Sequence, residues 1–340
     1  MKYNVLILGL GRIASLLEKD TLRYHPCTHA GVLLNSSLSK NFQIKGIFDI
    51  DQTRIMEFLS FWKLNKNNIL TDLEKIQMGQ FDLCIVASTS SSHFLNTKFA
   101  IQLGIKHILI EKPICTKEAD LKKLITLANK NKVKIWVNHE RRYHPLYQYV
   151  RNMLHGNAWG TVKTIHASVL TSGISPGLAF EETGGGPLLH DGTHAIDYLD
   201  FLFGKRKKVH FTKFHTPKTQ KTESRALAVI EYPQDIFAFL EAGGERRYFQ
   251  FEVDIQTSEN RIILNNDGHK FYRSEESNLY RGFRSLKPLE LPQFKNSNPW
   301  IELYKEILNH LQGKGKEILG DLSANQRIFD LIKEISVQKS

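Results

Sequence analysis

The feature that most restricts the fold of this chain is a glycine-containing turn directly after a short apolar run. Val5 to Leu8 are all apolar, and the segment Gly9-Leu10-Gly11-Arg12-Ile13-Ala14 follows at once. A short apolar run without polar alternation is typical of a strand buried on both faces of a parallel sheet. We therefore expect a strand, a tight turn and then a helix that runs through Leu16 and Leu17.

The same order of strand and helix repeats through the first part of the chain. Further strand candidates are Gln43 to Phe48, Leu83 to Ala87, Ile105 to Ile110 and Val133 to Val137. Segments with helical apolar spacing lie between them, at Arg54 to Phe61, His93 to Leu103 and Glu118 to Asn131. This alternation predicts right-handed βαβ units, and so an α/β domain of the Rossmann type with a doubly wound parallel sheet.

After about Val137 the pattern changes to alternating stretches with few helices between them. These stretches are Thr161 to Val169, Arg225 to Tyr232, Ile236 to Glu241, Phe249 to Ile255 and Asn260 to Asn265. Such a run predicts an α+β domain with a largely antiparallel, open sheet and a final helix near Asn325 to Val337. A length of 340 residues also favours two domains. We place the cofactor-binding domain at 1–137. The domain for substrate binding and oligomerisation is placed at 138–340.

The charge balance is positive, with a formal net charge of +11. An anionic ligand, a phosphate-bearing cofactor or nucleic acid would each fit this charge. The positive residues are scattered, however, and clusters such as Lys205-Arg206-Lys207-Lys208 carry no interleaved aromatic residues. We therefore expect a solvated lysine-rich surface and no nucleic-acid partner.

The three cysteines lie far apart in the sequence, at positions 27, 84 and 115, without a CxxC pair. This spacing favours neither a disulfide framework nor a zinc site, which fits a reducing compartment. The apolar segments are also too short for a signal peptide or a membrane span. The sequence thus predicts a cytoplasmic protein with no membrane partner and no metal.

The turn after the first strand has the GxGxxA pattern of dinucleotide-binding proteins. Gly9 permits the tight turn, and Gly11 lets the backbone of Arg12 and Ile13 approach a pyrophosphate at the helix start. Glycines at such a turn more often serve turn geometry alone. The position of this pattern, after the first strand of a βαβ series, favours dinucleotide binding.

Asp49 closes the second predicted strand and is the candidate for binding the adenosine ribose hydroxyls. A carboxylate there would repel a 2′-phosphate, so the expected cofactor is NAD, with NADP possible because Arg54 or Arg12 could accommodate a phosphate. Asp49 lies 38 residues after Gly11 rather than about 20, so Tyr24 to Lys40 is expected to be an inserted loop. Alternatively, Asp49 or Asp51 simply caps the next helix.

Two further motifs extend the pattern. Glu111-Lys112-Pro113 ends the fourth predicted strand, and Gly184-Gly185-Gly186-Pro187-Leu188-Leu189-His190-Asp191-Gly192-Thr193-His194-Ala195-Ile196-Asp197 follows later. With the glycine turn, these motifs resemble the Gfo/Idh/MocA family of sugar and cyclitol dehydrogenases over nearly the whole chain. The resemblance implies an NAD(P)-dependent oxidoreductase that transfers hydride between nicotinamide and a sugar, cyclitol or sugar-nucleotide hydroxyl.

Lys112 is the first catalytic candidate. Ligands of doubly wound sheets bind at the carboxyl ends of the strands, where a lysine ammonium could stabilise alkoxide character on a reacting hydroxyl. The alternative is a solvent-exposed loop lysine. The resemblance also implies cofactor contacts for Lys112 and its neighbour Glu111, and substrate contact for Lys112.

His194 matches the family histidine thought to act as acid and base, which suits imidazole near neutral pH. The family often has aspartate four residues earlier, where this chain has His190, and the carboxylate moves to Asp191. His190 could bind substrate instead, while Asp191 could orient a histidine or cap a helix. A metal held by these three residues is not expected, because no further carboxylate or cysteine converges on them.

Further candidates complete the expected site. Ser88 and His93 resemble the family loop near the nicotinamide ribose, although a hydroxyl-rich helix cap explains them equally well. Asn138, Arg141 and Tyr143 follow the last predicted parallel strand, in a region that approaches substrate in the family. The resemblance also implies a homodimer or homotetramer. Two alternatives to a dehydrogenase remain: an NAD-assisted glycoside hydrolase and a non-catalytic NAD(P)-binding regulator.

Overall fold

A computed structural model describes residues 2–171, 186–218, 222–291, 294 and 298–337. The chain divides into two compact units. The first unit comprises residues 1–144 and 296–325, and the second comprises residues 145–295 and 326–340. We describe each unit by itself.

The first unit is built on a five-stranded parallel sheet in the order β2-β1-β3-β4-β5. Its strands are β1 (Tyr3–Leu8), β2 (Phe42–Phe48), β3 (Leu83–Val86), β4 (His107–Ile110) and β5 (Lys134–Val137). The helices of this unit are α1 (His29–Asn35), α2 (Gln52–Phe61), α3 (His93–Gln102), α4 (Glu118–Asn131) and α8 (Pro299–Leu311). The expected parallel α/β domain of the Rossmann type is therefore confirmed.

Both faces of this sheet are buried, as the apolar runs predicted. Val5 and Ile7 of β1 lie in one core cluster with Trp300 and Leu303 of α8. The alternate residues of β1, Leu6 and Leu8, are also inaccessible to solvent and point to the opposite face. Because side chains on both faces are buried, the strand has no polar alternation.

The helix after the glycine turn is interrupted. A short 3-10 helix at Leu16–Lys19 follows the turn, and the first α-helix starts only at His29. The amides of His29 and Ala30 nevertheless donate to the carbonyls of Ile13 and Ala14, at 3.2 and 2.9 Å. Residues 15–28 therefore form an excursion within the helical backbone. The expectation of one loop over Tyr24 to Lys40 was wrong in this respect, since α1 lies inside that range.

Thr28 explains where the helix resumes. Its hydroxyl oxygen accepts a hydrogen bond from the amide of Gly31 at 3.0 Å, which makes Thr28 the N-cap of α1. The next five residues, His29 to Leu33, are all buried.

The second unit contains an eight-stranded sheet in the order β13-β12-β11-β10-β6-β9-β8-β7. Its strands are β6 (Val162–Leu170), β7 (Lys208–His215), β8 (Arg225–Tyr232), β9 (Ile236–Gly243), β10 (Gln250–Thr257), β11 (Asn260–Asn265), β12 (Lys270–Glu276) and β13 (Arg284–Pro288). All neighbours pair antiparallel except β6 and β9. The largely antiparallel sheet is thus confirmed.

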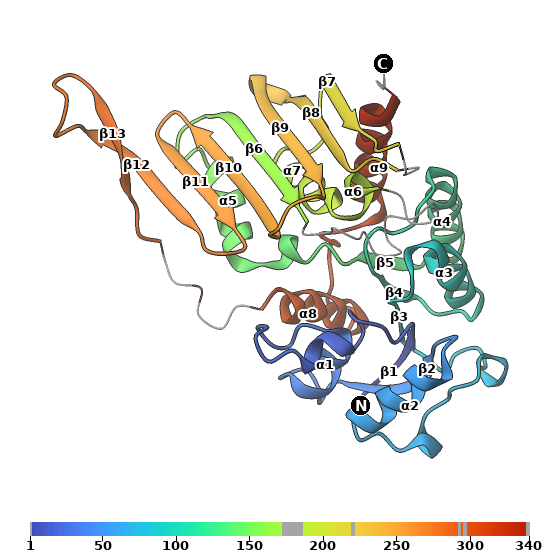
Figure 1. The fold of residues 1–340 in the computed structure, drawn as a ribbon. Helices are drawn as coiled ribbons and strands as arrows, with labels where there is room; N and C mark the ends of the chain where they lie inside the picture. The colour runs from blue at the N-terminus through green and yellow to red at the C-terminus, as the bar shows by residue number, and fades with distance from the viewer. Residues whose placement is uncertain (1, 172–185, 219–221, 292–293, 295–297, 338–340) are drawn as a thin grey trace. The chain divides into compact units, whose positions relative to one another are not determined.

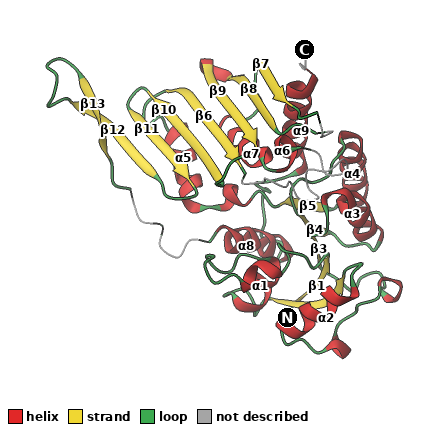
Figure 2. Cartoon of the chain, in the orientation of Figure 1, coloured by secondary structure: helices red, strands yellow, loops and turns green. Residues whose placement is uncertain are grey.

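Helices cover one face of this sheet (Figure 1; Figure 2). They are α5 (Pro145–His155), α6 (Pro187–His190), α7 (Gly192–Phe203) and α9 (Leu322–Val337). Aromatic side chains on β7 and β9, namely Phe211, Phe237 and Phe239, are exposed. Among the described residues, no helix has the length and apolar character needed to span a membrane.

Candidate functional site

The carboxyl ends of the five parallel strands bring most of the predicted residues of the first unit to one edge of the sheet. Gly9 follows β1 and Asp49 follows β2. Ser88, Glu111 and Asn138 come within two residues of the ends of β3, β4 and β5. Ligands of open α/β sheets bind at this edge, so the candidate site is built here.

Gly9 is required by the fold itself. Its φ angle is +95°, a region that favours glycine. A Cβ atom on Gly9 would also lie 2.4 Å from the backbone of Ser88, which belongs to the loop after β3. The turn therefore packs directly on the neighbouring loop, and a side chain at position 9 would separate them.

Gly11 is not required by the packing of the chain. A Cβ atom there would meet only one guanidinium nitrogen of Arg54, at an ordinary distance of 3.9 Å. The open space beside Gly11 fits the approach of a pyrophosphate to the turn, which is the reason dinucleotide-binding turns carry glycine at this position. The neighbouring Arg12 is exposed and Ile13 is half-buried.

Asp49 stabilises the same turn through hydrogen bonds. Its carboxylate accepts the amide of Leu10 at 2.8 Å and the amide of Asp51 at 3.0 Å. Asp51, and not Asp49, caps α2 by accepting from the amide of Thr53. A guanidinium nitrogen of the half-exposed Arg54 lies 3.8 Å from Asp49 Oδ2. One acid and one cation therefore lie close together at the end of β2.

His93 connects two loops of the site. Its Nδ1 lies 2.8 Å from the carbonyl oxygen of Pro113, and its Nε2 lies 3.0 Å from that of Ser88. The ring is buried, and this burial lowers the pKa of His93. The side chain thus holds the Ser88 loop against the segment that follows Lys112. The hydroxyl of Ser88 bonds to Ser92 and Asn96.

Glu111 is anchored from two sides. Its Oε1 accepts from His29 Nε2 at 3.0 Å and from Asn138 Nδ2 at 2.5 Å. Burial opposes ionisation, but these hydrogen bonds and the charge of Lys112 outweigh it, so the pKa of Glu111 is lowered. A fixed anion therefore precedes the half-buried Lys112 at the end of β4.

Asn138 contributes an acceptor to the same place. Its amide nitrogen donates to Glu111, which fixes the orientation of the side chain. Its buried Oδ1 finds no hydrogen-bond partner among the described residues. A buried polar atom of this kind is costly unless a ligand or water satisfies it. Asn138 therefore offers an acceptor for a ligand hydroxyl or amide.

Arg141 and Tyr143 lie in the turn after β5 with different surroundings. Arg141 pairs with Glu140 at 2.7 Å and is half-buried. Tyr143 lies in the core cluster of the first unit, and its hydroxyl is 3.4 Å from Glu306 Oε1 in α8. Core packing accounts for the tyrosine ring, so we do not carry Tyr143 into the proposed site.

The remaining candidates belong to the second unit. His190 ends α6 and is buried, Asp191 lies between α6 and α7, and His194 lies in the first turn of α7. The backbone of Asp191 accepts from the amide of His194 at 3.0 Å, while its side chain makes no cap hydrogen bond. Gly184 and Gly185 lie outside the described residues.

Two residues that anchor the site were not singled out from the sequence. His29 Nε2 holds Glu111, and its Nδ1 lies 2.8 Å from the hydroxyl of Tyr304 in α8. No local pattern marks them, because Tyr304 is 275 residues from His29. The one sequence feature at His29 is its place directly before the apolar stretch Ala30 to Leu34.

Known proteins share both parts of this architecture. Residues 3–139 match the model of the oxidoreductase family with the NAD-binding Rossmann fold. Residues 147–263 match the model of the GFO/IDH/MocA C-terminal domain. An uncharacterized oxidoreductase of Synechocystis sp. is 28% identical over 207 residues, which are 59% of this chain and 51% of that protein. The chain thus matches about half the length of this curated relative.

Two solved structures have a similar fold. UDP-N-acetylglucosamine 3-dehydrogenase of Acidithiobacillus ferrooxidans superposes with a TM-score of 0.74 at 17% identity, over 99% of this chain and 97% of that chain. In sequence it is 31% identical over 111 residues, 32% of this chain and 33% of that enzyme. A super-repressor mutant of Gal80p from Saccharomyces cerevisiae gives a TM-score of 0.79 at 14% identity, over 99% and 95%. With two family models matched in order along one chain, this protein belongs to the Gfo/Idh/MocA family of NAD-binding oxidoreductases.

Proposed function

We propose that the protein is an NAD-dependent dehydrogenase that interconverts a hydroxyl and a ketone on a sugar nucleotide. The observation that carries the proposal is the group at the ends of β4 and β5. There, Lys112 follows a buried, doubly anchored Glu111, and Asn138 offers a buried acceptor. A lysine next to a fixed anion, at the end of the strand beside the one that carries the unsatisfied acceptor, suits a substrate hydroxyl that becomes an alkoxide as it is oxidised.

Lys112 and its neighbours perform the binding steps. The ammonium of Lys112 donates to the reacting oxygen and stabilises the negative charge that develops on it. Glu111 stays ionised and keeps this ammonium in place electrostatically, since the pKa of Glu111 is lowered. The nicotinamide, when bound, supplies the hydride acceptor.

The proton of the hydroxyl needs an acceptor, and we assign this role to His194. The assignment rests on the family resemblance, with imidazole suited to proton transfer near neutral pH. His190 and Asp191 are assigned to substrate binding and to orientation of a histidine, again by resemblance. His194→Ala is expected to slow turnover and remove the acidic limb of the pH profile, while His194→Gln tests whether a hydrogen bond alone is enough.

The sugar-nucleotide class rests on charge and on one relative. A net charge of +11 favours an anionic substrate, and Arg141 is the nearest described arginine to Asn138 in sequence. The Acidithiobacillus relative carries UDP-N-acetylglucosamine in its name. Sugar phosphates and cyclitols are the neighbouring classes that a substrate panel should include.

NAD is proposed over NADP because of Asp49. Two amides already bind this carboxylate, yet its charge remains next to the expected ribose position and would repel a 2′-phosphate. Asp49→Asn keeps an acceptor oxygen and removes the charge, so the ratio of NADPH to NADH affinity should rise. Arg54→Ala is the counterpart, and it should lower NADPH affinity alone.

The test of the proposed activity is turnover of UDP-sugars, sugar phosphates and inositols with NAD, for the wild type and for Lys112→Met. Lys112→Met should leave the Kd for NADH within about twofold and lower kcat about 100- to 1000-fold, as expected for loss of a donor at the reacting oxygen. Lys117→Met is the control, because Lys117 is exposed and lies five residues further on. Equal loss of binding and turnover in Lys112→Met would contradict the catalytic assignment.

Two alternatives give different results in the same assays. An NAD-assisted glycoside hydrolase would release aryl alcohol from an aryl glycoside without net reduction of NAD. A regulator would bind NADH but turn over no substrate. The similarity in fold to a mutant of Gal80p is the reason to test this alternative.

We also propose a homodimer or homotetramer built on the open face of the second sheet. The exposed aromatic residues on β7 and β9, Phe211, Phe237 and Phe239, support this proposal, because an apolar patch on a sheet face favours association. Phe239→Lys should then lower the mass measured by light scattering to that of a monomer.

A further inference from the structure

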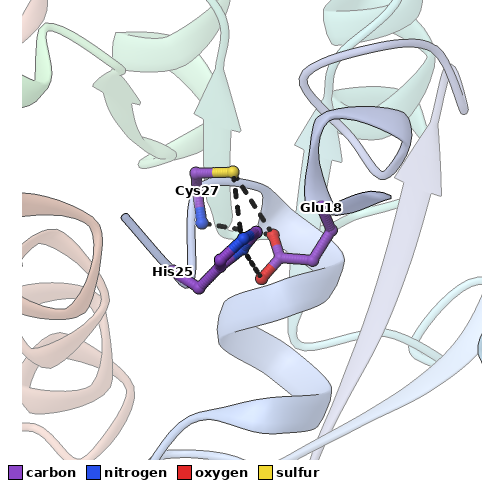
Figure 3. Close-up of side chains that lie close together, drawn as sticks. All are labelled: Glu18, His25 and Cys27. Atoms are coloured by element: carbon purple, nitrogen blue, oxygen red, sulfur yellow. Dashed lines mark hydrogen bonds and ion pairs between the residues drawn. The ribbon is translucent and has the colours of Figure 1, made fainter. Parts of the chain in front are cut away.

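The excursion at residues 15–28 brings together three side chains that can bind metals. Glu18, His25 and Cys27 each offer one ligand atom, and these atoms lie within 4.8 Å of one another (Figure 3). His25 Nδ1 is 3.0 Å from Glu18 Oε1, and Cys27 Sγ is 3.7 Å from Glu18 Oε2 and 3.9 Å from His25 Nδ1. In a tetrahedral zinc site, nitrogen, oxygen and sulfur ligands are separated by about 3.4 to 3.6 Å, from the usual bond lengths.

Both ring nitrogens of His25 face acceptors. Its Nδ1 faces the carboxylate of Glu18, and its Nε2 faces the carbonyl oxygen of Asp20 at 3.0 Å. Both neighbours are acceptors, so a neutral ring can satisfy only one of them. A divalent cation between Nδ1 and Glu18 would satisfy both of these groups. The Nε2 bond to a carbonyl would then be the contact that commonly orients a metal-binding histidine.

The carboxylate of Glu18 is held in place by the fold. It accepts from the hydroxyl of Thr28 at 2.7 Å and from the amide of Cys27 at 3.1 Å. A Cβ atom on Gly31 would lie 2.5 Å from this carboxylate, so glycine leaves the space that Glu18 occupies. The side chain of Glu18 is 7% exposed and pairs with no lysine or arginine in the described part of the chain. A largely buried anion of this kind requires a positive partner.

We propose that Glu18, His25 and Cys27 bind one zinc-like divalent cation, with water completing the coordination. The mixed carboxylate, imidazole and thiolate set suits Zn²⁺ better than Mg²⁺ or Ca²⁺, which prefer oxygen ligands alone. His25 is partly exposed, which leaves a side from which ion and water can enter. Because Glu18 also bonds to Thr28, the N-cap of α1, the ion would hold the excursion against the start of α1. It would thus stabilise the local structure.

The thiol imposes one requirement. Burial and the carboxylate of Glu18 raise the pKa of Cys27 to about 11. The ion therefore has to displace the thiol proton on binding.

The test uses the full chain after treatment with a chelator. Titration with Co²⁺ should give one equivalent of binding and the absorption of a Co²⁺–thiolate bond, and Zn²⁺ should displace it. Cys27→Ser should lose the thiolate absorption and weaken Zn²⁺ binding at least tenfold, and His25→Gln should weaken it to a similar extent. Cys115→Ser, at a buried cysteine outside the cluster, should bind like the wild type.

X-ray absorption of the zinc-loaded wild type provides a readout that does not depend on variants folding. It should show one sulfur ligand and the rest nitrogen or oxygen. Zinc bound without a sulfur ligand, or with equal affinity in Cys27→Ser, would overturn the proposal. Failure of the wild type to bind a stoichiometric ion would also overturn it, and would identify the contact between His25 and Glu18 as an ordinary ion pair.

Discussion

Gly9 and Gly11 share one motif but meet different constraints. The sequence predicted both glycines as cofactor-binding residues, and the structure separates a glycine needed by the fold from one that leaves space. We predict that Gly9→Ala destabilises the protein by more than about 1 kcal/mol, since φ is positive and the Cβ atom meets backbone.

Gly11→Val is the matched comparison. The Cβ atom that it adds would meet only a guanidinium nitrogen of Arg54, at 3.9 Å. We therefore predict a change in the free energy of unfolding of at most about 0.5 kcal/mol. Its affinity for NADH should nevertheless fall at least tenfold, because the valine occupies the space beside the turn. Urea denaturation and a fluorescence titration measure the two effects. A large loss of stability in Gly11→Val would contradict this reading.

His29 of α1 contacts Glu111, the neighbour of the catalytic candidate Lys112. We predict that His29→Ala lowers the free energy of unfolding by about 1 to 3 kcal/mol, because Glu111 loses a buried donor. Tyr304→Phe should cost less, about 0.5 to 1.5 kcal/mol, since only the bond to His29 Nδ1 is lost. A larger loss in the free energy of unfolding for Tyr304→Phe than for His29→Ala would show that the contact between His29 and Glu111 is not the main one.

At the scale of elements, the strands were the most predictable features. Apolar runs fixed the five parallel strands within two residues at either end, and β8 and β11 match their predicted ranges. The edge strands β7 and β13 and the strand β12 next to β13 were missed, because much of each strand is exposed and polar. Without a buried face, a strand has no clear apolar alternation.

The excursion before α1 could not be predicted for a different reason. The hydrogen bonds from His29 and Ala30 back to Ile13 and Ala14 join parts of the chain 16 residues apart. Local periodicity carries no information about such a pairing. The cluster at Glu18, His25 and Cys27 was missed with it, since its spacing matches none of the usual zinc motifs.

His93 links α3 to the loop after β4, and this buried histidine predicts that the stability of the fold depends on pH. Burial lowers the pKa of His93 below its unfolded value of 6.5. The unfolded chain therefore binds this proton more readily, and stability is lost as the pH falls below about 6.5. This single group contributes at most about 1.4 kcal/mol per pH unit.

His93→Gln cannot take up this proton. The difference in the free energy of unfolding between pH 7.5 and pH 5.5 should therefore be smaller in the variant than in the wild type. Denaturant titrations at the two pH values measure it. An unchanged difference would show that His93 is not protonated on unfolding in this range.

At the scale of the whole molecule, the sequence did not indicate that α8 returns to the first unit. The sequence pattern predicts a boundary between 137 and 138, whereas the described residues 298–325 belong to the first unit. Trp300, Leu303, Tyr304 and Ile307 of α8 are buried in its core cluster. Burial of four such side chains contributes about 6 to 12 kcal/mol, similar to the whole stability of a typical domain.

We therefore predict that residues 1–144 alone do not fold stably. Joining residues 298–325 to them by a flexible linker should restore cooperative unfolding and NADH binding. Circular dichroism during thermal unfolding tests both chains. A stably folded 1–144 fragment would show that α8 is dispensable.

The candidate site could be predicted in part. Lys112 and Asp49 were proposed from their positions after parallel strands, and Glu111 and Asn138 from the family resemblance. The topology of the parallel sheet brings these strand ends to one edge. Their partners His29 and Tyr304 depend on long-range packing and were not predictable. The roles of His190, Asp191 and His194 stay predictions from the family resemblance.

The most direct test of the account is a fluorescence titration of the purified protein with NADH and NADPH, alongside the Gly11→Val variant. The account predicts micromolar binding of NADH, weaker binding of NADPH, and loss of NADH binding in the variant without loss of fold. No binding of either cofactor by the folded wild type would contradict the central claim that this chain is an NAD-dependent dehydrogenase.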